Sequence, residues 1–215
     1  MMELFFFDIE TAGNYPDYKT FQSNDFTGSS LFKKKHDKMW SDRDINQSYI
    51  ENSGIISTYG KIVCISYGFI ENNGKIFIKS LVGEEYDIIN KFNKVLEKVQ
   101  SKNFNVSGYR ILYFDIPWFL HKCHKYSIDP VDIILSYNKK PWEMRITDIS
   151  EDWKGKFAWS YSFDEVVYEL GIQSPKDKMD GSDVHIKYWN GDIDDIREYC
   201  EKDILACIEV SNKMY

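Results

Sequence analysis

Residues 3–9, Glu-Leu-Phe-Phe-Phe-Asp-Ile, are the feature that most constrains the fold. The run is short, apolar and rich in aromatic side chains, which is typical of a strand buried within a sheet. Successive side chains of a strand point to opposite faces, so Asp8 and Glu10 are expected on the same face. Like charges this close repel unless a positive group lies between them. The acids indicate either a functional site or a strand end that reaches solvent, and this segment alone does not decide between them.

Strands and helices alternate along the rest of the chain. Asn72-Asn73-Gly74 favours a hairpin turn, and apolar spacing predicts a helix from Glu84 to about Gln100. We expect strands over 61–70, 75–82 and 104–107, and helices over 115–126, 163–170 and from about 193 nearly to the C-terminus. Ser162 and Glu165 form a capping box, and Asp192 is expected to cap the last helix. The pattern predicts the α/β class.

Residues 13–60 interrupt this pattern. They are polar and broken by Gly, Pro, Asn and Ser, with weak helical signals near 28–40 and 44–53. The segment is too long for a simple turn, so we expect an insertion at about 13–60. The chain has 215 residues, a length that suits one domain over residues 1–215.

Composition excludes several classes of protein. The chain has 27 Lys and Arg against 34 Asp and Glu, a net charge of −7, which argues against coating nucleic acid or anionic lipid by bulk charge. No apolar run approaches the roughly 18 residues of a membrane span, and no signal peptide is recognised. The four cysteines form no C-x-x-C pair, which fits a reducing compartment. We expect a soluble, unexported, cytoplasmic protein with no membrane partner.

Two further acids stand where apolar residues are expected. Asp203 lies within the apolar stripe of the last helix, and Tyr199 lies one turn before it. Asp115 follows Tyr113 and Phe114 and opens another helix. Each has an ordinary alternative: Asp203 could pair with a Lys, and Asp115 could cap its helix. Taken together, Asp8, Glu10, Asp115 and Asp203 could hold two divalent ions roughly 3.5–4 Å apart, an arrangement used for phosphoryl displacement.

Three segments, in order, resemble the motifs of the DEDD superfamily of 3′–5′ exonucleases. Phe7–Thr11 resembles the first motif, Gly108–Pro117 the second, and Tyr199–Asp203 the Tyr-x-x-x-Asp third. The resemblance is to the tyrosine-type branch (DEDDy) and to the proofreading exonuclease domain of family B DNA polymerases, including stand-alone exonucleases of that kind. It implies an RNase H-like fold, a mixed central β-sheet flanked by helices.

The resemblance also implies roles for individual residues. Asp8, Glu10 and Asp203 would hold the tighter of two metal ions, Mg²⁺ or Mn²⁺, and Asp8 would bridge to the second. Asp115 would bind the second ion, partly through water, and Tyr199 would orient or help deprotonate the attacking water. The family's usual Asn is Arg110 here. An Arg could contact a phosphate of the substrate instead.

Substrate contacts are expected beside these acids. Thr11 and Phe114 adjoin the proposed ligands and are expected to grip the terminal nucleotide. Phosphate contacts are open for four lysine clusters: 33–35 with 38, 139–140, 154 with 156, and 176 with 178. The aromatic side chains of Trp142, Trp153, Trp159 and Tyr161 could stack bases, but the alternation over 157–161 favours a strand and core packing.

These features predict a metal-dependent 3′–5′ exonuclease that releases nucleoside monophosphates from single-stranded ends. DNA is favoured over RNA by the resemblance, which also points to a DNA polymerase or replication complex as a partner. Two alternatives stay open: an exoribonuclease with the same acids, and an idle module that binds nucleic acid or docks on a polymerase.

Overall fold

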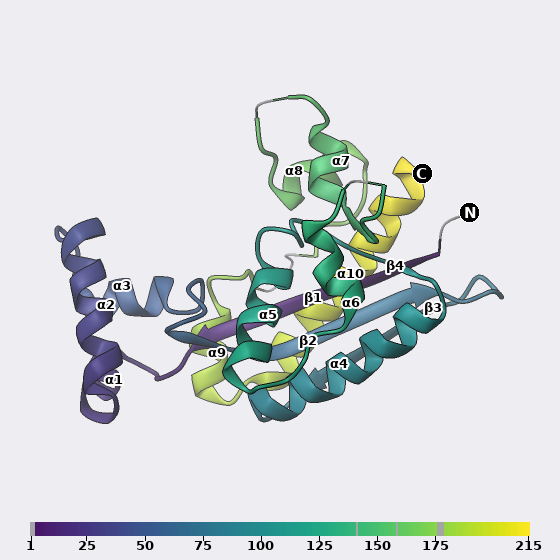
Figure 1. Ribbon diagram of the computed structural model, residues 1–215. Helices are drawn as coiled ribbons and strands as arrows, with labels where there is room; N and C mark the ends of the chain where they lie inside the picture. Colours follow the sequence, from purple (N-terminus) through teal and green to yellow (C-terminus); the bar gives the residue numbers. More distant parts are fainter. Residues whose placement is uncertain (1–2, 141, 158, 176–178) are drawn as a thin grey trace.

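A five-stranded mixed sheet forms the centre of the protein. The computed structural model describes residues 3–140, 142–157, 159–175 and 179–215 (Figure 1). The strand order is β3-β2-β1-β4-β5; β1 is antiparallel to β2 and parallel to β4. The strands are β1 (Leu4–Gly13), β2 (Gly60–Ile70), β3 (Ile76–Val82), β4 (Asn105–Gly108) and β5 (Ile146–Asp148). The expected buried first strand is therefore confirmed as the central strand.

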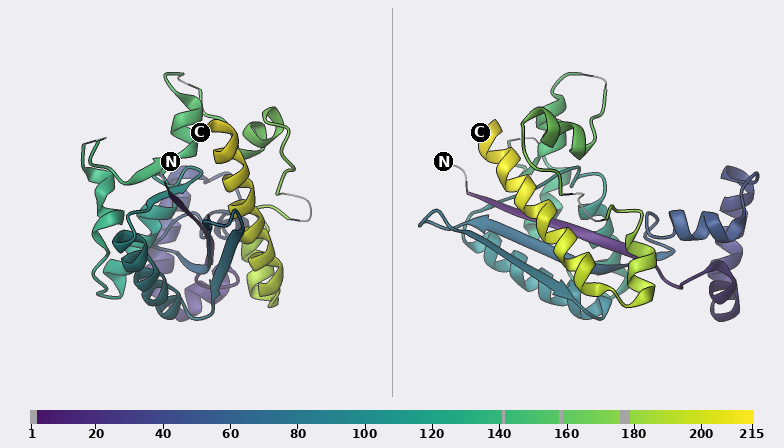
Figure 2. Two further views of the ribbon diagram at one scale, coloured as in Figure 1. Left: turned by 90° about the vertical axis from the view of Figure 1, so that its right-hand side faces the viewer. Right: turned by 180° about the vertical axis from the view of Figure 1, so that it is seen from behind.

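Helices cover both faces of the sheet. Helices α4 (Glu85–Ser101) and α5 (Asp115–Lys125) lie on one face, and α10 (Ile193–Met214) crosses the other, as Figure 2 shows from behind. Phe5 and Phe7 pack in the core beneath α4 and α5, whereas Phe6 packs with Ile204 and Ile208 of α10. Asp8 and Glu10 follow the alternation of Phe6 and so belong to the α10 face.

The α1–α3 segment, residues 14–59, lies at one end of the sheet (Figure 1). It contains α1 (Tyr18–Asn24), α2 (Phe26–Met39) and α3 (Ile45–Asn52), so the helical signals in this segment are confirmed. Its aromatic side chains form a small core of their own: Tyr18, Phe21, Phe32, Tyr49 and Tyr59. This segment therefore packs as an organised unit beside the sheet.

The remaining elements lie between β4 and α10. They are α6 (Asp132–Leu135), a 3₁₀ turn η1 (Ser136–Asn138), α7 (Ile149–Lys154), α8 (Phe163–Glu169) and α9 (Val184–Asn190). The capping box at the start of α8 is confirmed by hydrogen bonds in both directions between Ser162 and Glu165. No helix in the described part of the chain is long and apolar enough to cross a bilayer.

Three predictions are wrong, two of local structure and one of burial. Asp192 precedes α10, but its side chain makes no capping hydrogen bond. Residues 157 and 159–161 are not in a strand, and residue 158 lies outside the described residues. Trp142 and Trp159 are 77% and 72% exposed, so the expected core packing is wrong for both. Alternation over five residues mimics a strand, but without neighbouring strand partners it does not make one.

Candidate active site

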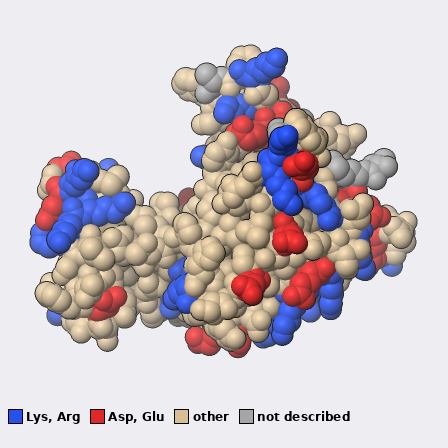
Figure 3. All heavy atoms as spheres, in the orientation of Figure 1, with Lys and Arg blue, Asp and Glu red and all other residues tan. Residues whose placement is uncertain are grey.

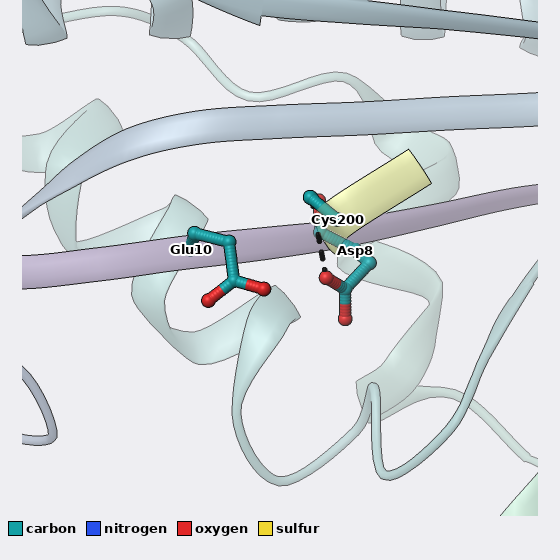
Figure 4. Close-up of side chains that lie close together, drawn as sticks. All are labelled: Asp8, Glu10 and Cys200. Atoms are coloured by element: carbon teal, nitrogen blue, oxygen red, sulfur yellow. Dashed lines mark hydrogen bonds between the residues drawn. The ribbon is translucent and has the colours of Figure 1, made fainter. Parts of the chain in front are cut away.

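The acidic pair of β1 lies at an irregularity of the sheet. Residue pairing between β1 and β2 shifts between Glu10 and Thr11, which marks a bulge. Bulges re-aim side chains and are frequent next to active sites. Figure 4 shows the carboxyl groups of Asp8 and Glu10 on the same side of β1, as the alternation predicts. Glu10 is 7% exposed and Asp8 is partly buried, so the strand does not simply end in solvent.

Cys200 of α10 completes a compact group with these acids. Its Sγ donates a 3.3 Å hydrogen bond to Oδ2 of Asp8 (Figure 4). One ligand atom from each of Asp8, Glu10 and Cys200 lies within 4.8 Å of the others. The sequence assigned Cys200 only to the apolar stripe of the last helix. Helical spacing identifies such a position as buried, but it gives no sign that the thiol faces a carboxylate.

Asp115 joins the site from the N-terminal end of α5. It is the first residue of the helix and only 3% exposed, and its Oδ1 accepts a 3.0 Å hydrogen bond from the backbone N–H of Ile9. The carboxyl group thus bonds to the strand residue between Asp8 and Glu10. This hydrogen bond joins the carboxyl group to the neighbouring strand, which favours the site interpretation over a helix cap.

Tyr199 and Asp203 face the same acids from α10. Tyr199 is 7% exposed, and Asp203 is half-buried one turn later, so the buried stripe expected for this helix is confirmed. The charge of Asp203 raises the pKa of both Asp8 and Glu10. Burial raises the pKa of Tyr199, and the charge of Asp203 and a hydrogen bond to it add to this shift. The structure therefore places the four predicted acids and the tyrosine close enough for their charges to shift one another's pKa values.

The carboxyl groups are strongly perturbed by this arrangement. Burial, followed by the charges of Asp115 and Asp203, raises the pKa of Asp8 well above its ordinary value. Burial and the charge of Asp8 do the same for Glu10, and burial raises the pKa of Asp115 to about 8. Apart from burial, the causes that raise these pKa values are other acids and thiols, and hydrogen bonds to Asp8 and Asp115 lower them. Ionising these carboxyls together is therefore costly in the metal-free protein, and a bound cation would lower that cost.

Asp148 is a structural residue of the site that the sequence analysis missed. It ends β5, is 3% exposed, and accepts hydrogen bonds from the backbone N–H groups of Arg110 and Leu112 at 3.1 and 3.0 Å. It also accepts from the N–H and hydroxyl of Ser150. The turn that leads into Asp115 is thereby fastened to the adjacent strand. A strand of three residues leaves too little pattern for this role to be foreseen.

Position 110 of the same turn has a left-handed backbone conformation. Arg110 has φ of +55°, in the left-handed region that Asn tolerates better than Arg. The Asn usual in the resembling motif therefore suits the backbone here, and the bond from the N–H of Arg110 to Asp148 supports the strained turn. The Arg110 side chain is exposed, where it is open to solvent and substrate.

Thr11 and Phe114 both line a cavity of about 280 Å³ beside Glu10. The Thr11 hydroxyl donates to the carbonyl of Gly54 at 2.5 Å, so it fastens the α1–α3 segment to the end of β1. Phe114 is partly buried, and its ring lies 5.8 Å from that of Trp118. Both residues therefore border a cavity beside a proposed metal ligand, and the Thr11 hydroxyl already has a hydrogen-bond partner. Their contact with a substrate stays a prediction.

The lysines of the described clusters are exposed or half-buried, and several of them have partners on the surface. Figure 3 shows Lys and Arg over the end of α2, where the cluster 33–35 with 38 lies. Lys33 is paired with Asp37, Lys154 with Glu151, and Lys140 lies over the ring of Trp142. The cluster formed by Lys176 and Lys178 lies outside the described residues. The exposed rings of Trp142 and Trp159 keep base stacking open, whereas Trp153 and Tyr161 pack partly against the core.

A comparison with protein families identifies this arrangement. Residues 55–210 match a family described as "Predicted 3′-5′ exonuclease related to the exonuclease domain of PolB". The chain belongs to this family. The match runs from before β2 into α10 and so includes Asp115, Tyr199 and Asp203, whereas Asp8 and Glu10 lie N-terminal to it. Membership confirms the resemblance to polymerase-related exonucleases, and with the mixed sheet it confirms the RNase H-like α/β fold.

One curated relative points the same way. The chain is 26% identical over 133 residues to "Putative DNA polymerase 060R" of Frog virus 3 (isolate Goorha). The similarity covers 51% of this chain and 13% of that protein, so the chain corresponds to a small part of the viral protein.

Proposed function

We propose that the protein is a metal-dependent 3′–5′ exonuclease of the DEDDy type that releases nucleoside monophosphates from single-stranded DNA ends. The observation that carries the proposal is the convergence of Asp8, Glu10 and Asp115 in one group of carboxyls whose pKa values are raised by burial and by neighbouring acids, with Asp203 acting on all three. Burying several carboxyl groups together costs free energy. Groups perturbed in this way cluster at functional sites. Membership of a family of predicted 3′-5′ exonucleases indicates that the function of this site is the hydrolysis of phosphodiester bonds.

The donor set fits two Mg²⁺ or Mn²⁺ ions. These hard cations take carboxylate oxygens, and the site offers four carboxyl groups whose mutual repulsion they would relieve. Asp8, Glu10 and Asp203 would hold one ion, Asp8 and Asp115 the other. When bound, such ions lower the pKa of water and stabilise charge on phosphoryl oxygens.

The protein's own groups position the reactants. In the metal-free protein, desolvation and the nearby acids hold the pKa of Tyr199 far above its ordinary range, so its hydroxyl is protonated at neutral pH. This supports orientation of the attacking water by a hydrogen bond, with deprotonation left to other groups. Thr11 and Phe114 would border the terminal nucleotide, and the exposed Arg110 would contact a phosphate.

The net charge of −7 is compatible with a polyanionic substrate. Two divalent ions would offset the four site carboxylates, and an exonuclease needs to hold only a few terminal nucleotides.

DNA is favoured because the family is related to the PolB exonuclease domain and the viral relative is described as a DNA polymerase. We also propose a role in DNA replication or repair with a polymerase as partner, and a cytoplasmic location, which fits four free buried thiols.

Degradation of a 5′-labelled single-stranded DNA oligonucleotide tests this proposal. With Mg²⁺ or Mn²⁺ we expect a ladder of shortened products and released mononucleotides, and no reaction with EDTA. An RNA oligonucleotide of the same sequence serves as the matched substrate. Faster degradation of RNA would favour the exoribonuclease alternative. Both substrates left at full length would favour the idle binding module.

A further inference from the structure

The cavity beside Glu10 is lined by residues from several parts of the chain. Glu10, Thr11 and Phe114 adjoin the proposed metal site, and Ile50, Gly54 and Ile55 belong to the α1–α3 segment. The rest of the lining is Ile9, Glu51, Gly181, Ser182 and His185. Ile50 and Gly54 lie outside the family match, which begins at residue 55. Part of the lining is thus supplied by a segment of this chain that the family match does not include.

Hydrogen bonds join the backbone of Gly54 and Ile55 to residues beside the site. Thr11 donates its hydroxyl proton to the carbonyl of Gly54, and Trp118 Nε1 donates to the carbonyl of Ile55 at 3.3 Å. Gly54 lies so close that a Cβ there would be 3.0 Å from the Thr11 carbonyl oxygen. His185 fastens the start of the segment, since its Nδ1 accepts from the Gly13 N–H and its Nε2 contacts the Pro16 carbonyl at 3.0 Å.

The lining combines apolar and polar side chains. Phe114, Ile50 and Ile55 supply apolar surface, and Glu10, Glu51, Ser182 and His185 supply polar groups. Ile55 is 61% exposed although it is apolar and its backbone carbonyl is hydrogen-bonded. An aromatic side chain such as Phe114 can bind a base by stacking without reading sequence. The volume of about 280 Å³ lies just below the roughly 300–1,000 Å³ usual for small-ligand pockets, which suits one nucleotide.

We propose that Ile50 and Ile55 form, with Phe114, the pocket for the base and sugar of the terminal nucleotide, so that the α1–α3 segment controls how tightly that nucleotide binds. This inference rests on the proposed exonuclease function. It gives the segment a part in substrate selection and makes residues 50–55 specificity-determining rather than catalytic. Because Glu10 is also a proposed metal ligand, a nucleotide in the pocket would have its phosphate near the proposed ions.

Binding of deoxyadenosine monophosphate in the presence of Ca²⁺, followed by calorimetry, tests the pocket without requiring cleavage. We expect Ile50→Trp, which fills the cavity, to weaken binding at least about tenfold. In oligonucleotide degradation, the same variant should raise KM more than it lowers kcat. Leu31→Trp is the matched control, because Leu31 is 49% exposed on α2 and does not line the cavity, and it should bind as the wild type does.

The outcomes separate this inference from the proposed function. Wild-type affinity in both Ile50→Trp and Ile55→Trp, or no binding of the monophosphate by the wild type, would overturn the pocket even if DNA is degraded. If wild-type protein degrades neither DNA nor RNA, the proposed function fails on its own measurement. Should Ile50→Trp fail to fold, Ile55→Ala replaces it, and unchanged binding in that variant would likewise overturn the pocket.

Discussion

The backbone N–H of Ile9 donates a 3.0 Å hydrogen bond to Oδ1 of Asp115, a residue 106 positions later in the chain. Ile9 lies between Asp8 and Glu10 on the central strand, so one backbone bond fixes the third acid relative to the first two. The spacing of the acids is therefore set by the fold before any cation binds. The electrostatic cost of that arrangement falls on the metal-free protein, which makes it measurable.

Asp115 should make the metal-free protein less stable as the pH rises. Its pKa is raised to about 8 from an ordinary 3.8, so the folded state binds a proton that the unfolded state has lost between these values. The free energy of unfolding should thus be highest at the acidic end of this window and fall as the pH approaches about 8. Urea unfolding in EDTA across the window should show this slope, and Asp115→Asn should reduce it. Equal slopes in the two proteins would contradict the assignment.

Replacing Asp8 should separate stability from activity. Asp8→Asn removes one of the repelling charges but keeps an oxygen that can accept the Cys200 thiol proton. We expect the metal-free variant to be more stable than the wild type at neutral pH, since burial and the neighbouring acids raise the pKa of Asp8 well above its ordinary value. Cleavage should fall roughly a thousandfold or more, because a ligand of both proposed ions is lost. Thermal unfolding and single-turnover cleavage measure the two effects, and a destabilised variant that still cleaves would count against both.

Tyr199→Phe should slow the reaction without removing the ions. The hydroxyl is buried beside Asp203 and held protonated by desolvation, which suits it to orienting water. Cleavage should fall roughly 100- to 1,000-fold, a size typical of losing one positioned hydrogen-bond donor in a transition state. Mn²⁺ affinity should change little. If the variant lost Mn²⁺ binding together with activity, the hydroxyl would be supporting the ligands instead.

Asp148 should act through Asp115 as a positioning residue. Asp148→Ala leaves the N–H groups of Arg110 and Leu112 without their acceptor, so we expect a loss of about 2–4 kcal/mol in stability and weaker Mn²⁺ binding. Asp148→Asn keeps one acceptor oxygen and should lose less of both.

Asn93→Ala is the control for a merely structural effect of Asp148. Asn93 is also buried and bonded to backbone groups, but it joins α4 to residues 129 and 131. It should lower stability and leave Mn²⁺ affinity intact. The positioning role is wrong if Asp148→Ala binds Mn²⁺ as tightly as the control does.

Local periodicity accounts for what the sequence predicted well. The alternation in β1 placed Asp8 and Glu10 on one face, and helical spacing placed Tyr199 and Asp203 on one stripe, because each pattern spans a whole element. That these elements meet depended on the resemblance to known exonucleases. The assignment of ligands, acids and substrate contacts to single residues stays a proposal.

Contacts between distant elements account for what the sequence did not predict. The roles of Asp148 and Cys200 depend on hydrogen bonds across the fold, which leave no periodic signal in either segment. The alternation over 157–161 favours core packing for most of Trp142, Trp153, Trp159 and Tyr161, but the structure leaves Trp142 and Trp159 on the surface. Asp192 has the residue type of a cap, yet its φ of −80° and ψ of 48° are not the extended conformation usual for a capping side chain.

Titration with Mn²⁺, followed by the electron paramagnetic resonance signal of the free ion, tests the central claim most directly. Wild-type protein should remove Mn²⁺ from solution with two ions bound at saturation, and Asp8→Asn and Glu10→Gln should each lose at least one of them while remaining folded. If wild-type protein binds no Mn²⁺, or if both variants bind as the wild type does, the carboxylates of β1 are not a metal site and the nuclease mechanism proposed for them is wrong.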